Sequence, residues 1–87
     1  MNFDDLFIFR KERFSIGQET ENQTYYLSIP VNNGMVEYEE YYEISKEEFE
    51  RFSASLEQMR QVATMCRERR NDDKLIMKPG RLRGTPT

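Results

Sequence analysis

The sequence has 87 residues, of which 37% are hydrophobic and 33% are charged, with a formal net charge of −3. A domain of this size is near the lower limit for a single hydrophobic core, so an enclosed, water-free active site is difficult to build and a binding surface is easier. Six phenylalanines and five tyrosines compensate in part, because each aromatic ring buries a large apolar area.

Groups that carry out catalysis or bind metal ions are scarce. The chain has no histidine, which removes the commonest general base and the commonest metal ligand. Cys66 is the only cysteine, so neither a disulfide within the chain nor a thiolate cluster can form, which is typical of a reducing compartment. Asp72 and Asp73 could bind a divalent cation together with a glutamate, but a solvated pair that ends a helix is the simpler interpretation. The sequence therefore predicts no enzyme activity, no metal site and no cofactor.

The sequence also lacks the usual membrane signals. No apolar run approaches the roughly 20 residues that a membrane-spanning helix requires. The first residues, MNFDDLFIFRKE, place acids before the apolar run and offer no small-residue cleavage site, unlike a signal peptide. We therefore expect a cytoplasmic protein with no membrane partner.

The segment from Leu6 to Ile16 contains two apolar runs separated by the charged residues 10–13. A short helix is one interpretation, because Asp4 and Asp5 would favour its first turn. A strand, bent or bulged at the charged residues, is preferred, because phenylalanine and isoleucine are enriched in strands and two strands alone rarely form a stable sheet. Residues 18–23 are polar and lack periodicity, and we expect a loop there.

Residues 25–44 predict a β-hairpin around which the rest of the chain is organised. Its turn is expected at Asn32-Asn33-Gly34, because a tight turn needs residues that tolerate positive φ. Strand alternation places the side chains on two faces. The apolar face is expected to carry Tyr25, Leu27, Ile29, Val36, Tyr38, Tyr42 and Ile44, and the opposite face Glu37, Glu39, Tyr41 and Glu43. Three carboxylates and a tyrosine on one side of a strand indicate a binding surface.

Glu40 falls on the apolar face under this alternation, where an unpaired carboxylate would be costly. A β-bulge at Glu39 and Glu40 would turn both side chains outward. Arg67 or Arg70 on a covering helix could instead pair with Glu40, and a carboxylate directed at a ligand is a third interpretation. The candidate partner-binding residues are therefore Glu37, Glu39, Glu40, Tyr41 and Glu43.

A helix is predicted from Ser45 or Lys46 to about Arg70. Ser45 and Glu48 have the spacing of a capping box, in which each side chain accepts a hydrogen bond from the backbone N–H of the other residue. An apolar stripe then recurs at steps of three and four residues: Phe49, Phe52, Leu56, Met59, Ala63 and Cys66. Cys66 is therefore expected to be a small core residue and not a nucleophile.

These elements predict a single small α+β domain over residues 1–87, with an antiparallel sheet of three or more strands covered on one face by one long helix. The helix would span about 35 Å, which matches a strand of ten residues. Beyond the helix, residues 75–77 are expected to form a brief strand or extended patch. Pro79-Gly80 marks a turn, and residues 81–87 are expected to be extended or loose, so that residues 79–87 could form a loose tail.

The charge is polarised along the chain, with a net −6 over residues 37–50 and +5 over residues 51–87. Mutual screening of the two regions at the surface is one interpretation. Nucleic-acid binding by the basic part is another, but aromatic residues are not interleaved with the basic ones. The pI of the domain is also about 5.0, whereas nucleic-acid modules are strongly basic. We therefore expect no nucleic-acid partner.

Three stretches of the chain resemble a known family: Ser28-Ile29-Pro30, VEYEEYY from Val36 to Tyr42, and PGRLRGTP from Pro79 to Pro86. On these residues, most of the region 24–87 is similar to small bacterial immunity proteins of polymorphic toxin systems, including contact-dependent growth inhibition. Members often have aspartate after Val36 and histidine before Asp72, where this chain has Glu37 and Asn71.

The resemblance implies a cytoplasmic protein without catalysis that binds the active-site region of a cognate protein toxin. Toxin domains of these systems are often nucleases, which must present a cationic surface to phosphate, and an acidic strand face would complement such a surface. A different interaction module, such as a regulator or a secretion chaperone, could instead use the edge of the same strand. An enzyme would have to be a carboxylate–metal hydrolase, which is the weakest of the three hypotheses.

Overall fold

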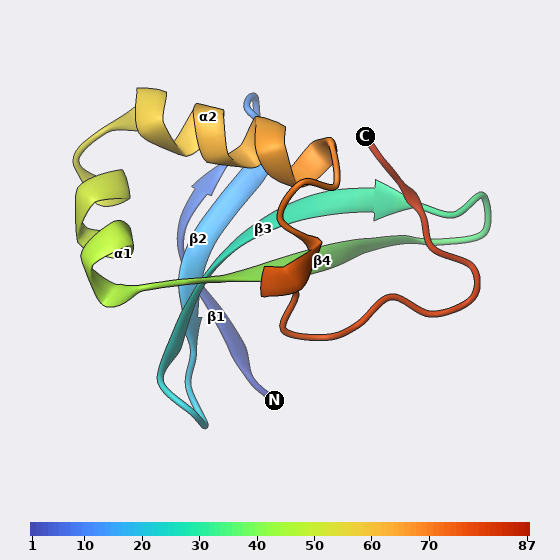
Figure 1. Ribbon diagram of the computed structural model, residues 1–87, viewed down its shortest axis with the longest axis horizontal. Helices are drawn as coiled ribbons and strands as arrows, with labels where there is room; N and C mark the ends of the chain where they lie inside the picture. Colours follow the sequence, from blue (N-terminus) through green and yellow to red (C-terminus); the bar gives the residue numbers. More distant parts are fainter.

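The computed structural model describes residues 1–87 and shows an antiparallel sheet with two helices on one face (Figure 1). The strands are β1 (Phe3–Phe9), β2 (Phe14–Glu19), β3 (Thr24–Asn32), β4 (Glu37–Ile44) and the short β5 (Thr85–Pro86); the helices are α1 (Lys46–Ser53) and α2 (Leu56–Arg67), followed by the 3₁₀ turn η1 (Asp72–Lys74). The four long strands lie in the order β1-β2-β3-β4, and β5 pairs with the end of β3. The predicted α+β fold with an antiparallel sheet is confirmed. Neither helix is long and apolar enough to cross a membrane.

The first hairpin is formed by β1 and β2, which the sequence had suggested as one bent strand. The charged residues 10–13 are its turn, and Arg13 takes a positive φ of 60° there. Phe9 pairs with Phe14 on either side of this turn. The loop expected at residues 18–23 is shorter than expected, because Gln18 and Glu19 still pair within the sheet. The two apolar runs, residues 6–9 and 14–16, do lie in strands, but the pattern missed the strand residues on either side of them and did not distinguish a bend from a reversal of the chain.

The second hairpin, β3–β4, is present as predicted, with Tyr25 paired to Ile44 at one end and Asn32 to Glu37 at the other. Gly34 has φ of 90° in the connection. The Asn33 side-chain oxygen accepts hydrogen bonds from the backbone N–H groups of Met35 and Val36 at 3.0 and 2.9 Å. This arrangement takes Val36 out of the strand and leaves it 55% exposed, so its predicted place in the core is wrong.

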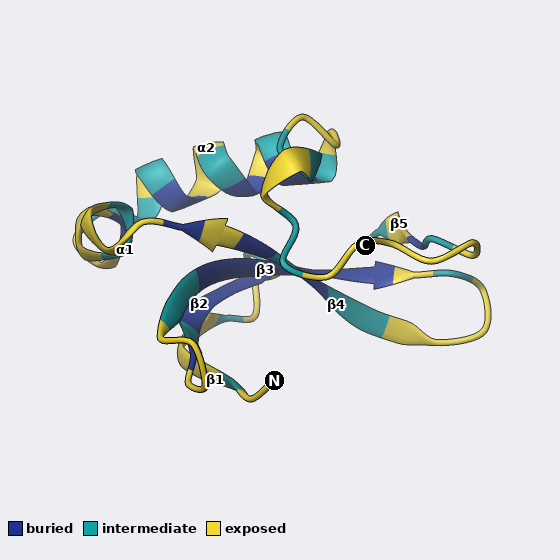
Figure 2. Ribbon diagram, turned by 60° about the horizontal axis from the view of Figure 1, so that its bottom comes forward, coloured by how far each residue is buried: buried dark blue, intermediate teal, exposed yellow.

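The hydrophobic core lies between the helices and one face of the sheet (Figure 2). Its buried members are Phe14, Ile16, Leu27, Ile29, Val31, Tyr42, Ile44, Phe52, Met59, Ala63 and Cys66. The predicted stripe on the helical segment is therefore confirmed, with Phe49 and Leu56 packed at the margin of this core. Burial raises the pKa of the Cys66 thiol to about 12, so this side chain stays protonated inside the core.

The helical segment is broken into two helices, so the single long helix predicted from Ser45 to Arg70 is wrong. The capping box of Ser45 and Glu48 starts α1 as predicted. Ser55 then adopts an extended conformation, and its side chain accepts a hydrogen bond from the backbone N–H of Gln58 at 3.3 Å, which caps α2. The apolar stripe continues across the break, and therefore its periodicity gave no sign of it.

The C-terminal segment, residues 72–87, folds back over the part of the sheet that the helices leave uncovered (Figure 1). Leu75 bridges to Tyr42, so the brief strand or extended patch expected at residues 75–77 is present at Leu75 alone, and residues 76 and 77 form a bend. The backbone N–H of Gly84 donates to the Tyr38 hydroxyl at 2.7 Å. A side chain at Gly84 would meet the backbone of Asn32 at 2.8–3.0 Å, so only glycine allows this approach.

Arg83 is the main contact of this segment, and its guanidinium bridges two carboxylates. It donates to Glu40 at 2.8 and 3.1 Å and to Asp72 at 2.6 and 2.9 Å. Residues 79–87 are therefore fastened, and the prediction that they are loose is wrong. The prediction of Arg67 or Arg70 as the partner of Glu40 is wrong too, because Arg67 donates to the backbone carbonyls of residues 12 and 13 and Arg70 pairs with Glu68.

Candidate functional site

The face of the sheet opposite the helices is concave. The ring of Phe3 on β1 stacks on Tyr41 of β4, with centroids 3.7 Å apart and planes 13° from parallel. Because β2 and β3 lie between these strands, the sheet must curl until its outer strands approach each other across this face. Tyr26 fills the space edge-on to both rings. Gly17 lies beneath them, where a Cβ atom would clash with the carbonyl oxygen of Asp4.

Four of the five candidate residues share this concave face, as the alternation of β4 predicted. Glu37 and Glu43 are exposed, whereas Glu39 and Tyr41 are half-buried. Glu40 points to the opposite side and is only 6% exposed, where Arg83 and the Tyr42 hydroxyl occupy its carboxylate. Glu40 therefore holds the C-terminal segment in place and is not accessible to a partner.

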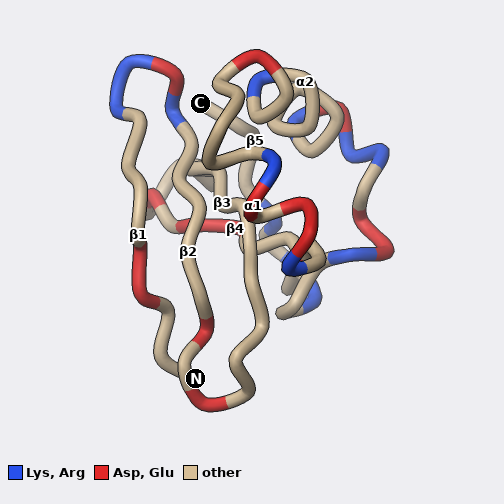
Figure 3. Tube along the Cα trace, turned by 90° about the vertical axis from the view of Figure 1, so that its left-hand side faces the viewer, with Lys and Arg blue, Asp and Glu red and all other residues tan.

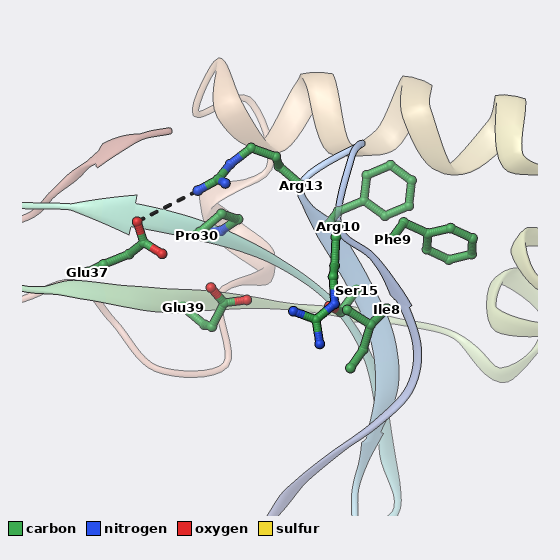
Figure 4. A pocket seen from close by; sticks show the side chains of 9 residues that line it. Ile8, Phe9, Arg10, Arg13, Ser15, Pro30, Glu37 and Glu39 are labelled. Atoms are coloured by element: carbon green, nitrogen blue, oxygen red, sulfur yellow. Dashed lines mark ion pairs between the residues drawn. The ribbon is translucent and has the colours of Figure 1, made fainter.

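Glu39 lies in a groove with a volume of about 310 Å³ that is lined by residues of all four long strands (Figure 4). The Ser28 hydroxyl donates to its carboxylate at 3.2 Å. Burial raises the pKa of Glu39, the negative charges of Asp5 and Glu37 raise it further, and the hydrogen bond from Ser28 and the charge of Arg13 only partly oppose this. The negative charge of Glu39 is thus only partly balanced by the groups around it.

One end of the groove carries basic side chains that the sequence analysis did not place there. Arg10 and Arg13, from the turn between β1 and β2, line the groove beside Glu37 and Glu39. Arg13 lies 3.7 Å from Glu37 and also donates to the Thr87 backbone carbonyl and hydroxyl at 3.2 and 2.8 Å. Figure 4 shows the ion pair between Arg13 and Glu37 crossing the end of the groove. The acidic surface is therefore partly neutralised at this end only.

Asp5 is a further acidic residue on this face that the sequence analysis missed. Its carboxylate accepts a hydrogen bond from the Tyr26 hydroxyl at 2.5 Å. Burial and the nearby charge of Asp5 raise the pKa of both Tyr26 and Tyr41, so the two hydroxyls remain protonated. β1 is irregular between Asp5 and Phe7, and neither this shift nor the curl of the sheet can be read from alternation.

We call Asp5, Glu37, Glu39 and Glu43 the concave acidic face. They surround an aromatic floor of Phe3, Tyr26 and Tyr41. Apart from the ion pair of Glu37 with Arg13, these carboxylates have no salt-bridge partner in the chain. Such carboxylates, next to a tyrosine hydroxyl and a stacked ring, are suited to receiving lysine or arginine side chains. Nowhere in the chain do three or more acidic or cysteine side chains come together in a way that could hold a metal ion.

Comparison with known proteins adds nothing to the interpretation of the concave acidic face, which therefore rests on the residues described above. No family model, no curated protein and no solved structure matches the chain.

Proposed function

We propose that this chain is an immunity protein that binds and neutralises a cognate protein toxin through the concave acidic face. The observation that carries the proposal is Glu39, a half-buried carboxylate whose pKa is raised by burial and by neighbouring negative charges. Such a group is stabilised when a cationic side chain arrives beside it. The toxin as the partner is supported by the resemblance of residues 24–87 to immunity proteins.

The toxin that fits this face best is a nuclease domain. A nuclease must present lysine and arginine side chains to the phosphates of its substrate. One of these lysine or arginine side chains would enter beside Glu39 and Asp5, close to the Tyr41 hydroxyl. Glu37 and Glu43 lie about 20 Å apart along β4, because the strand rises about 3.4 Å at each of the six steps from one to the other. These two exposed carboxylates would steer the encounter, and the docked chain would exclude the substrate. The chain would inhibit the toxin by occupying its substrate-binding surface, without a catalytic step of its own.

The alternative of a regulator or a secretion chaperone that adds a strand to the edge of β4 gains no support. Leu75 bridges to Tyr42, and the backbone N–H of Ile76 donates to the Tyr41 carbonyl at 2.9 Å. The chain's own C-terminal segment thus occupies the middle of this edge.

A charge-reversal experiment tests the proposal. The variant Glu37→Lys, Glu43→Lys changes two exposed side chains, so we expect its stability to change by less than about 0.5 kcal/mol. We expect its association rate with the toxin domain to fall about tenfold at low salt and the difference to shrink as salt is added. Protection of cells against the toxin, at matched expression, should weaken accordingly.

The matched control is Glu50→Lys, Glu68→Lys, which makes the same change of charge at two exposed positions of the helical segment. This variant should protect cells as the unaltered protein does. If the control loses protection while the strand variant keeps it, the interface lies on the helices and the assignment of the site is wrong. If both variants protect fully and neither changes the association rate, the acidic face has no part in binding.

A further inference from the structure

A slot lies between the outer edge of β4 and residues 77–82, which run beside this strand on the side away from β3 (Figure 1). Hydrogen bonds join its two walls at both ends. The backbone N–H of Ile76 donates to the Tyr41 carbonyl at 2.9 Å, and the Asn33 side-chain amide donates to the Leu82 carbonyl at 3.3 Å. The slot has a volume of about 390 Å³, which is within the range of ligand-binding sites.

The walls of the slot are mainly apolar and aromatic. Tyr38 and Tyr41 line it from β4, and Met77, Pro79 and Leu82 line it from the C-terminal segment. Met77 and Leu82 are 47% and 69% exposed, so this apolar surface meets water in the isolated chain. Burial of apolar surface against a partner is favourable, and exposed apolar surface beside a groove is typical of an interaction site.

The slot also contains backbone groups that have no partner. Pro30 lies opposite Glu39 in the ladder, but Pro30 has no N–H, and its carbonyl accepts from the Thr87 N–H at 3.2 Å. The two residues therefore form a non-hydrogen-bonded pair, and the N–H and C=O of Glu39 point to the outer edge of β4. No other group of the chain bonds to them. The slot thus offers a hydrogen-bond donor and an acceptor beside its apolar walls.

The charges around the slot favour a neutral group inside it. The carboxylate of Glu40, which also lines the slot, already accepts from Arg83 at 2.8 and 3.1 Å. Lys78 lines the opposite wall and would repel a cation. Glu39 and Tyr41, in contrast, belong both to the slot and to the concave side of β4, where acidic residues gather (Figure 3). A partner segment that enters from this side would therefore carry cations at the mouth of the slot and an uncharged side chain inside it.

We propose that the slot receives an aromatic side chain with a polar tip, tyrosine or tryptophan, from the toxin domain that docks on the concave acidic face. The ring would pack against Met77 and Leu82, and its O–H or N–H would donate to the Glu39 carbonyl. Both residue types are enriched among interface anchors, because they combine a large apolar area with a hydrogen-bonding group. Lysine or arginine residues next to the aromatic residue would pair with Glu37 and Glu39. The toxin as the source of the ring rests on the proposed function, whereas the aromatic site does not.

Binding of p-cresol, which has the ring and the hydroxyl of tyrosine, tests the slot without the toxin. In an NMR titration of the full chain, we expect a dissociation constant of about 1–10 mM, as for a small fragment. The shifted signals should be those of the Glu39 amide and of the methyl groups of Met77 and Leu82. The variant Leu82→Gln should abolish these shifts. It replaces a side chain that is 69% exposed, so the fold should be retained.

Butylammonium, which has the alkyl chain and the charge of lysine, is the matched probe. It should leave the methyl signals of Met77 and Leu82 unshifted. If butylammonium shifts these signals and p-cresol does not, the slot takes a cation and the proposal is wrong. The proposal is also wrong if p-cresol shifts only signals of the aromatic floor, such as those of Phe3 and Tyr26, because the ring then binds outside the slot.

The complex with the toxin domain tests the source of the ring. Leu82→Gln should raise the dissociation rate about tenfold, because the ring loses part of its apolar wall, and should leave the association rate unchanged, because no charge is altered. The matched control Leu6→Gln replaces an exposed leucine of β1 and should change neither rate.

The outcomes separate the slot from the acidic face. If Leu82→Gln dissociates as slowly as the unaltered protein while Glu37→Lys, Glu43→Lys associates more slowly, the toxin binds the acidic face without entering the slot and this proposal is wrong. If no toxin domain binds the chain while p-cresol still occupies the slot, the proposed function fails, and with it the toxin as the source of the ring, whereas the aromatic site is confirmed.

Discussion

The helix-side face of the sheet is covered in two halves, and the two covers are held by different forces. α1 and α2 cover one half with apolar side chains, among them Phe52 and Met59, which are 2% exposed. Residues 72–87 cover the other half through hydrogen bonds and the ion pairs of Arg83. Apolar burial is non-directional and grows with area, whereas the ionic cover requires every buried polar group to find its partner.

The difference between apolar burial and ionic contacts determines how the stability of each half responds to a substitution. An apolar contact loses stability in proportion to the volume removed, because neighbouring side chains relax only partly into the cavity. The ionic cover fails differently, because removal of Arg83 leaves the carboxylate of Glu40 buried without its cation. The same sheet face therefore combines a half that tolerates small changes with a half that does not.

The largest effect is expected from truncation of the apolar half. Phe52→Ala should lower the free energy of unfolding by about 3–5 kcal/mol, because the ring is almost fully buried between α1 and the sheet. The control Leu82→Ala, in the C-terminal segment, removes a side chain that is 69% exposed and should cost less than about 0.5 kcal/mol. Urea unfolding of the two variants makes the comparison. An equal loss for both would contradict the division into two halves.

A smaller loss is expected from the ionic half. Arg83→Met should lower the free energy of unfolding by about 2–3 kcal/mol, at the low end for a buried pair because Asp72 is 39% exposed. Adding Glu40→Gln should recover part of this loss, since the amide removes the buried charge and can still accept from the Tyr42 hydroxyl. If Arg83→Met unfolds at the same urea concentration as the unaltered protein, the C-terminal segment contributes no stability.

The smallest expected effect is the part of the loss of stability at low pH that comes from Asp72 in the ionic half. The hydrogen bond from Arg83 lowers the pKa of Asp72, against the opposing effect of burial. A carboxyl group with a lowered pKa in the folded state stabilises the fold above its unfolded pKa of about 4, and the contribution disappears as the pH falls through the folded value. The unaltered protein should therefore lose stability more steeply below about pH 4 than Asp72→Asn does.

The difference between these two proteins isolates Asp72, because other acids with a lowered pKa are present in both. Hydrogen bonds from the backbone of residues 2, 21 and 22 and from the Asn22 side chain outweigh the burial of Glu19 and lower its pKa to about 2. Urea unfolding at pH 7 and at a pH of about 3 is the measurement. Parallel pH profiles of the two proteins would show that Asp72 does not contribute through its charge.

The two halves also differ in what the sequence could predict. The apolar half follows from local patterns: the capping box at Ser45 starts α1, and the stripe from Phe49 to Cys66 identifies the buried side of the helical segment. The break at Ser55 escaped these patterns, although Ser55 and Gln58 have the spacing of a cap. A stripe with intact periodicity favours one helix over two.

The ionic half could not be predicted in this way. Strand alternation located Glu40 on the covered face, where pairing with a cation was one of three interpretations. Arg67 and Arg70 were the expected cations, whereas the actual partner is Arg83, which is 43 residues away in sequence. The choice depends on how the chain returns after α2, which no local pattern encodes. The concave acidic face was predicted for the residues of β4, but Asp5 was not, because its position depends on the curl of the whole sheet.

The separation between Glu40 and Arg83 also sets the order of events when the protein is made. Synthesis proceeds at about 5–20 residues per second, so Arg83 is added roughly 2–9 s after Glu40. Throughout that interval the Glu40 carboxylate on β4 has no Arg83 guanidinium with which to pair. The hairpins can form early, but Glu40 cannot enter the interior at low cost until Arg83 has been synthesised. Completion of this half of the fold is therefore tied to the synthesis of Arg83.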